Sequence, residues 1–136
     1  MPAGKALFFP ILNVIFGSGT FDCDPTNPGV PCDVDVLRSG AASFVDNPIL
    51  LDANIDGQTL QDLSNYRAKS PVFSITVPDD AIFGIPLTGT FTPQVSDGYW
   101  LMVAPLSAGE HTIHFAATTN LGFTVEVTYH LTVAPN

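Results

Sequence analysis

Apolar and polar residues alternate along much of the second half of the chain. The segment 72–77 (VFSITV) alternates in this way, as do the segments 110–117 and 123–133 on either side of a turn. A period of two places successive side chains on opposite faces of a strand, so these segments predict antiparallel strands. The last two are predicted to form a terminal hairpin, and 99–104 (YWLMVA) predicts a further strand.

The first half of the chain predicts a buried strand and a helix. Residues 5–16 are nearly all apolar, which is typical of a strand covered on both faces. Residues 34–45 carry an apolar stripe at three- and four-residue spacing, and Asp33 precedes them. This pattern predicts a short helix with Asp33 as its cap, and Pro48 ends it.

A short hairpin is predicted directly after the helix. Residues 49–55 (ILLDANI) form a strand that enters a turn at Asp56-Gly57, and residues 58–60 lead out of it. Asp-Gly is a strong signal for a two-residue hairpin turn because both positions take positive φ readily.

The remaining segments complete the predicted fold. Residues 61–70 are expected to be an ordered connection, and 81–97 a Gly/Pro/Thr-rich stretch with a short strand near 87–91. Short strands with Pro and Gly between them, and one short helix near 34–45, predict a mainly β protein. The expected architecture is an antiparallel β-sandwich, immunoglobulin-like or jelly-roll-like. A chain of 136 residues is expected to form a single domain, 1–136.

The terminal hairpin also predicts which side chains face each other. With the turn at Asn120, Glu110 lies opposite His130 and His114 opposite Glu126. This register places the charged groups on one face and the aliphatic groups on the other, as one-sided burial requires. The two Glu/His pairs are about 13 Å apart at the usual strand rise, so one metal ion cannot use both pairs.

The charge balance excludes two classes of partner. The chain has 4 Lys and Arg against 13 Asp and Glu, a net charge of −9. It contains no basic cluster that could neutralise phosphates, which argues against nucleic acids and anionic membrane surfaces. No stretch of 18 uninterrupted apolar residues is present, so no membrane span is predicted.

The two cysteines predict a compartment. Cys23 and Cys32 enclose a Pro-rich segment, DCDPTNPGVPCD, that suits a closed loop. A disulfide there would stabilise the fold by about 2.5 to 3 kcal/mol and would imply a secreted, periplasmic or cell-surface location. Residues 6–16 also imitate the apolar region of a signal peptide, although Pro10 and Asn13 interrupt it and favour a strand.

The acidic residues around this loop are candidates for calcium. Asp22, Asp24, Asp33 and Asp35 would bring several carboxylates together, and calcium prefers such hard oxygen ligands. Their spacing matches no calcium loop in detail. The alternative is a solvated acidic loop in which Asp33 only caps the helix. No other cofactor is indicated.

Aromatic residues are candidates for ligand binding. Tyr99 and Trp100 are neighbours on a predicted strand, so one ring is expected inside and the other outside. An exposed aromatic ring can stack on a sugar, and Tyr66 with Arg67 could line such a surface. In the alternative, Trp100 fills the core and Arg67 pairs with an aspartate.

Catalytic motifs are absent from the sequence. It contains no nucleophile elbow, phosphate-binding glycine loop or zinc-protease helix. His111 and His114 lie three apart in a predicted strand, so they point to opposite faces and do not form a metal pair. The neighbours Asp79 and Asp80 lie in a turn, where their side chains diverge. A hydrolase would have to assemble its site from scattered Asp and His residues.

Five runs of the sequence carry a resemblance: GKALFFPILN (4–13), IDGQTL (55–60), YRAKSPVF (66–73), DGYWLMVAPLSAGEHTIHF (97–115) and VTYHLTV (127–133). They resemble a family of exported bacterial proteins whose function is not characterised. The resemblance spans most of the chain and implies a β-rich exported domain. It implies no activity and no catalytic or binding residue.

Taken together, the sequence predicts an exported binding or structural module without catalysis. Its ligand would be a surface, a glycan or a protein partner. One alternative is a self-assembling subunit or homo-oligomer whose apolar N-terminal strand pairs with a neighbouring chain. The other is a small hydrolase built from scattered Asp and His residues.

Overall fold

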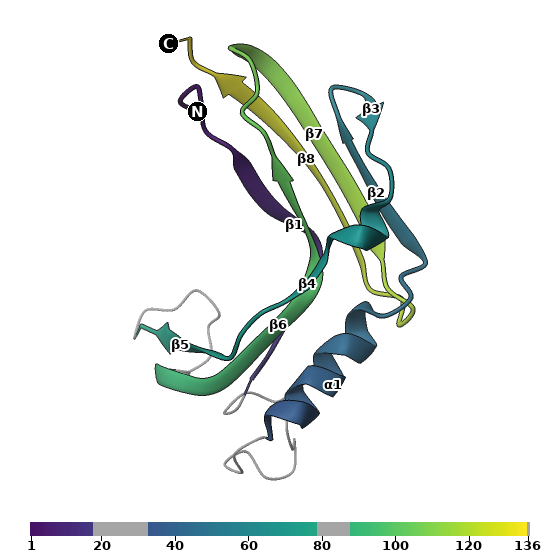
Figure 1. Cartoon of the computed structure of the whole chain (residues 1–136), viewed down its shortest axis with the longest axis vertical. Coiled ribbons are helices and arrows are strands. Elements are labelled where there is room, and N and C mark those ends of the chain that lie inside the picture. The colour runs from purple at the N-terminus through teal and green to yellow at the C-terminus, as the bar shows by residue number, and fades with distance from the viewer. Residues whose placement is uncertain (18–32, 79–87, 136) are drawn as a thin grey trace. The chain divides into compact units, whose positions relative to one another are not determined.

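The computed structural model describes residues 1–17, 33–78 and 88–135 (Figure 1). The protein is mainly β, with antiparallel sheets in two layers and one helix, as the sequence predicts. The elements are β1 (Leu7–Gly17), α1 (Val34–Val45), β2 (Leu50–Ile55), β3 (Gln58–Thr59), a 3-10 turn η1 (Leu63–Tyr66), β4 (Arg67–Lys69), β5 (Phe73–Val77), β6 (Gly89–Val103), β7 (Gly109–Thr118) and β8 (Thr124–Val133). No helix of the described ranges is long and apolar enough to cross a membrane.

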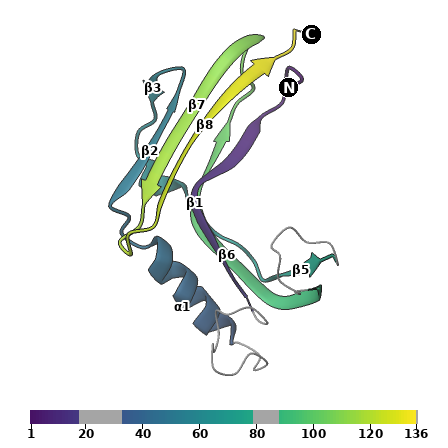
Figure 2. The ribbon, with the colours of Figure 1, turned by 180° about the vertical axis from the view of Figure 1, so that it is seen from behind.

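The strands form two sheets. One sheet has the order β1-β6-β4, with β5 also paired to β6, and the other has the order β3-β2-β7-β8. Figures 1 and 2 show β2, β7 and β8 running side by side in the second sheet. By its internal contacts the chain divides into two compact units, 1–13 with 44–68 and 98–136 (unit 1), and 14–43 with 69–97 (unit 2). The single domain expected from the length stays a prediction.

Unit 1 contains a two-layer core. Ile113, Phe115 and Ala117 project from β7 into it and are almost fully buried, and Ile11 and Tyr99 enter it from β1 and β6. The ring of Phe9 in β1 stacks on that of Phe115 with centroids 5.5 Å apart. The alternation of apolar and polar residues therefore buries one face of β7, as predicted.

Unit 2 has a small core under the helix. Leu37 and Ala41 of α1 pack with Val95 of β6, and Phe16 packs against this cluster. The helix begins as predicted, because the Asp35 N–H donates to Asp33 Oδ1 at 2.8 Å. Gly40 allows the helix to approach β1 closely, since a Cβ there would lie 2.7 Å from the ring of Phe16.

The Asp56-Gly57 turn is also confirmed. Ile55 pairs with Gln58, and the two turn residues have φ values of 52° and 79°. Positive φ at both central positions is the geometry of the tight hairpin turn that Asp-Gly favours.

Three predictions about strands are wrong. The expected short strand near 87–91 and the strand 99–104 belong to one long strand, β6. The strand predicted over 5–16 is not covered on both faces, since Phe8 is 62% and Ile15 46% exposed. These apolar side chains lie on β1, which is an edge strand of its sheet.

The third error concerns the register of the terminal hairpin. His114 pairs with Thr128 rather than with Glu126, and Thr112 rather than Glu110 pairs with His130. The turn differs because the Thr119 hydroxyl accepts the N–H of Phe123 at 3.0 Å. Since the partner shifts by two positions, each side chain keeps its predicted face.

Candidate functional site

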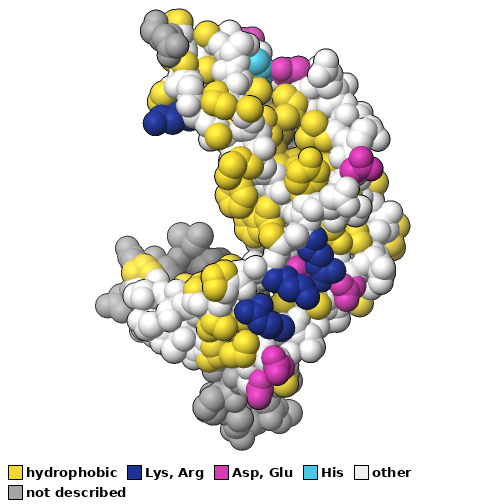
Figure 3. Space-filling model, viewed as in Figure 1, with side chains coloured by type: hydrophobic (Ala, Val, Ile, Leu, Met, Phe, Trp, Pro, Cys, Tyr) yellow, Lys and Arg dark blue, Asp and Glu magenta, His cyan; other side chains and the backbone are white. Residues whose placement is uncertain are grey.

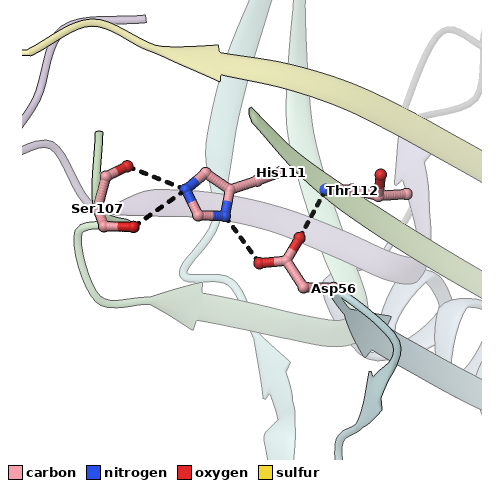
Figure 4. A network of polar contacts seen from close by, with 4 residues as sticks. All are labelled: Asp56, Ser107, His111 and Thr112. Atoms are coloured by element: carbon pink, nitrogen blue, oxygen red, sulfur yellow. Dashed lines mark hydrogen bonds and ion pairs between the residues drawn. The ribbon is translucent and has the colours of Figure 1, made fainter. Parts of the chain in front are cut away.

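One polar cluster joins the Asp56-Gly57 turn to the beginning of β7 (Figure 4). The Asp56 N–H donates to the Thr112 carbonyl, and the Thr112 N–H donates to Asp56 Oδ1, both at 2.8 Å. The second carboxylate oxygen, Oδ2, lies 2.7 Å from Nδ1 of His111. The tight turn thus aims the Asp56 carboxylate at two consecutive residues of β7.

The other ring nitrogen of His111 contacts Ser107, in the connection before β7. His111 Nε2 lies 2.9 Å from the Ser107 carbonyl oxygen and 3.5 Å from its hydroxyl (Figure 4). A carbonyl oxygen only accepts, so Nε2 carries a proton. Nδ1 donates to the Asp56 carboxylate. The ring therefore donates from both nitrogens, which is the imidazolium form.

The protonation of both partners follows from these contacts. The hydrogen bond with Asp56 raises the pKa of His111, and the Ser107 carbonyl raises it further against the opposing effect of burial. The hydrogen bond with His111 lowers the pKa of Asp56, and the bond from the Thr112 N–H adds to this. The pair is thus held as imidazolium and carboxylate.

The cluster contains the residue types of a hydrolase triad, but its geometry does not suit one. A histidine that activates a serine needs an unprotonated nitrogen facing the hydroxyl. His111 Nε2 instead donates to the backbone of the same serine at the shorter distance. We therefore interpret the cluster as a structural clamp that fixes the Ser107 connection and the Asp56 turn to β7.

A polar recess of about 230 Å³ lies beside the clamp and is open to solvent. Glu110, His130 and Thr132 line it together with the clamp residues. Within the described residues, no group of three or more His, Cys, Asp or Glu is arranged to hold a metal ion. The recess brings Glu110 and His130 to one place, as predicted, although they are not directly opposite.

A second histidine lies on the other face of β7. His114 Nε2 contacts Glu126 Oε1 at 3.1 Å, so this predicted contact forms along a diagonal of the hairpin. His114 Nδ1 lies 3.3 Å from the amide nitrogen of Asn54 and 3.6 Å from Asp52 Oδ2 on β2. These are cross-strand surface contacts.

The aromatic candidates are placed on two sides of the first sheet. Tyr99 is buried, and its hydroxyl donates to the Val45 carbonyl at 3.3 Å. Trp100 faces outward and stacks on Phe8 with centroids 5.3 Å apart and planes 8° apart. The prediction that one of the two neighbours is inside and one outside is confirmed, with Tyr99 rather than Trp100 in the core.

The other two residues of the predicted glycan surface are also on the surface of unit 1. Tyr66 is 48% exposed, while the Arg67 guanidinium forms an ion pair with Asp46 at 2.5 Å. The expectation that Arg67 pairs with an aspartate is thus confirmed. Figure 3 shows hydrophobic side chains gathered over the part of the view where β1 and β6 run through unit 1. A glycan site there stays a prediction.

The predicted calcium and disulfide residues are only partly described. Asp33 is the helix cap, and Asp35 is exposed in the first turn of α1. Asp22, Asp24, Cys23 and Cys32 lie outside the described residues. The calcium site and the disulfide therefore stay predictions.

An opening between the two layers of unit 1 was not predicted from the sequence. Two recesses of about 190 and 250 Å³ lie between β1 and the β7–β8 hairpin. They share Tyr129, which is 45% exposed and whose ring lies 6.0 Å from that of Phe115. Their further apolar lining includes Leu7, Phe9, Ile11, Val125, Val127 and Leu131.

The strands that border this opening are both edge strands. β1 ends one sheet and β8 ends the other, and in the described part of the chain β8 pairs with β7 only. At the C-terminal end of β8, Met1 contacts the edge that points away from β7. The N-terminal ammonium of Met1 donates to the Thr132 carbonyl, and the Met1 carbonyl accepts the Ala134 N–H. The remainder of the β8 edge is open in the described structure.

The hydrogen-bond pattern shows which groups lie along this edge. The Thr112 carbonyl points toward β2. The backbone N–H and C=O groups of the even-numbered residues of β7 therefore point toward β2, and those of the odd-numbered residues point toward β8. In β8 the even-numbered residues therefore point away from β7, in agreement with the contact of Thr132 to Met1. The backbone N–H and C=O of Glu126, Thr128 and His130 thus lie on the open edge.

Comparison with known proteins adds no relative. No family model, no curated protein and no solved structure matches the chain. The resemblance to exported β-rich bacterial proteins therefore stays a prediction.

Proposed function

We propose that this protein is an exported, non-catalytic module that binds an extended protein segment by β-strand addition at β8. The observation that carries the proposal is the opening between β1 and β8. It combines a row of outward-pointing backbone groups with an apolar recess directly beside it. An added strand would pair with the backbone of β8 and insert alternate side chains into the recess.

The physical cost of an uncovered edge supports this function. Proteins normally protect the edges of their sheets with charges, prolines, bulges or covering loops, because an open apolar edge invites pairing. β8 carries Glu126 and His130 on its outward side, but its inward side, which borders the recess, is apolar: Val125, Val127, Tyr129 and Leu131. The absence of catalysis in this proposal is supported by His111, whose two ring nitrogens both donate hydrogen bonds. Export is supported by the spacing of Cys23 and Cys32, which suits a disulfide.

The test uses a peptide that is unrelated to this chain. A labelled peptide of alternating threonine and valine with a lysine at each end would be titrated with dilute protein, and its fluorescence polarisation measured. We expect binding to the wild type and about tenfold weaker binding to Thr128→Pro, because proline removes one edge donor and distorts its neighbour. The Thr128 N–H makes no bond to β7, so this substitution leaves the β7–β8 ladder intact.

Two results would contradict the proposed function. One is the absence of saturable binding to the wild type. The other is equal binding by the wild type and Thr128→Pro. Met102→Ala is the matched control: this side chain is 72% exposed on β6 and lines neither recess. It is expected to bind the peptide like the wild type.

The stack of the exposed Phe8 on the half-buried Trp100 favours a second candidate function, recognition of a glycan. The two rings stand on the outer surface of the first sheet with Phe8 62% exposed. Aromatic faces of this kind can stack on sugar rings. Its test is a titration with soluble oligosaccharides, which should change the tryptophan emission of the wild type but not that of Phe8→Ala.

A further inference from the structure

The β8 edge has a sequence that is complementary to itself. An antiparallel partner strand must hydrogen-bond to the even-numbered residues, because these point away from β7. When two copies of β8 meet about a twofold axis, the residue on the axis faces itself. The residues on either side of it then face each other, one from each copy.

The register centred on Thr128 gives favourable pairs at each position. Glu126 of one copy then faces His130 of the other, twice by symmetry, and Thr128 faces Thr128. Opposite charges and threonine pairs are among the cross-strand pairs that stabilise antiparallel sheets. A register centred on Val127 or on Tyr129 would instead place Glu126 opposite a threonine.

The inward side chains agree with the same register. Val127 of one copy would face Tyr129 of the other, which is a pair of a β-branched and an aromatic residue. Both residues line the opening next to β1, and Tyr129 is 45% exposed. Pairing would therefore cover apolar surface that is accessible in one copy.

The charged groups around Glu126 and His130 leave both side chains accessible to a second copy. Glu126 is 70% exposed, and its described contact is to His114 on its own sheet. His130 is exposed and lies in the recess with Glu110, Asp56 and His111. In that recess Asp56 and His111 neutralise each other, so Glu110 and Glu126 of the second copy are the carboxylates that His130 would meet.

We propose that the strand bound at β8 is β8 of a second copy of this chain, paired antiparallel about Thr128. This inference rests on the proposed function and names its partner. The two four-stranded sheets would join into one continuous sheet across the interface. Two cross-strand pairs of Glu126 and His130 would set the register.

A charge-swap experiment tests this register. The mass of the full chain would be measured by light scattering over a concentration series at about pH 6, where imidazole is substantially protonated. The variants are Glu126→His, His130→Glu, the double swap, and an equimolar mixture of the two single variants. Thr128→Pro serves as the edge-blocked control.

We expect the wild type to dimerise and each single variant to dimerise about tenfold more weakly, because like charges would then face each other. The double swap restores the opposite charges, so its dimer should be as strong as that of the wild type. In the mixture, one variant supplies histidine at both positions and the other glutamate, so a heterodimer should form. Heterodimer formation also shows that both single variants are folded.

Three results would overturn the inference. They are a wild type that stays monomeric at about millimolar concentration, a dimer that Thr128→Pro leaves unchanged, and a dimer that both single swaps leave unchanged. None of them affects the peptide titration, which tests strand addition without Glu126 and His130 pairing. Failure of the register and failure of the proposed function can thus be told apart.

Discussion

His111 donates from Nδ1 to Asp56 Oδ2 at 2.7 Å, although the two residues are 55 positions apart in the chain. The side chain of His111 is 11% exposed and that of Asp56 45% exposed. Together with Ser107, they tie the connection before β7 to the turn after β2. A contact of this kind couples folding to pH.

The first prediction concerns this pH dependence. The pKa of His111 is raised above its ordinary value of 6.5, so the stability it contributes is fully present below about that pH and is lost as pH rises through the raised pKa. The pKa of Asp56 is lowered from 3.8, so its contribution is present above about 3.8 and is lost as pH falls through the lowered pKa. The wild type should therefore exceed His111→Gln in stability most clearly between these two values.

Urea unfolding of both proteins at a series of pH values measures the difference. It should shrink as the solution is made alkaline. A difference that is constant from acid to alkaline pH would show that the clamp is not charged.

A second prediction concerns the close packing of β1 and β6. A Cβ on Gly98 would meet the backbone of β1 at the Leu12 carbonyl and lie 2.7 Å from Asn13 Cα. Backbone atoms cannot move aside as a flexible side chain can, so Gly98→Ala should destabilise the fold by about 2 kcal/mol or more. Met102→Ala, on the same strand but at a side chain that is 72% exposed, should be nearly neutral. Thermal unfolding compares the two, and equal melting temperatures would contradict the close approach.

A third prediction separates two tyrosines. Tyr99 is buried and donates to the Val45 carbonyl, so Tyr99→Phe should cost about 1 kcal/mol, because it leaves that carbonyl without this donor. Tyr129 is 45% exposed, and Tyr129→Phe should leave the free energy of unfolding unchanged. Denaturant unfolding of both variants provides the comparison. If Tyr129→Phe were the more destabilising of the two, the buried hydrogen bond of Tyr99 would be contradicted.

A fourth prediction uses the single tryptophan of the chain as a reporter. Phe8 covers one face of Trp100, so Phe8→Ala should expose the indole and shift its emission to longer wavelength. If a glycan stacks on this surface, soluble oligosaccharides should change the emission of the wild type and not that of Phe8→Ala. Saturable binding with equal affinity in both proteins would exclude the Phe8 and Trp100 surface as the site.

Local signals in the sequence predicted local structure correctly. The helix over 34–45 and the turn at Asp56-Gly57 depend on a cap, a periodic apolar stripe and positive φ, all of which are encoded by neighbouring residues. The register of the last hairpin was missed because the Thr119 hydroxyl and Gly122, with φ of 84°, shape the turn. The Gly/Pro/Thr-rich composition of 81–97 indicated irregular structure, whereas β6 runs without a break over Gly89–Val103.

The clamp and the open edge could not be predicted from local patterns. His111 was recognised as facing the opposite side from His114, but its partner Asp56 is brought to it only by the pairing of β2 with β7. The edge position of β8 depends on the order of all strands in the sheet. An alternating strand looks the same in sequence whether it has one neighbour or two.

The most direct test of the open β8 edge is amide hydrogen exchange, followed residue by residue by NMR in dilute protein. In this account, the amides of Glu126, Thr128 and His130 exchange fast, because they point away from β7. Those of Val125, Val127 and Tyr129 exchange slowly, because they are bonded to β7. Equal protection of both sets in dilute, monomeric protein would contradict the account, since the edge would then already be covered.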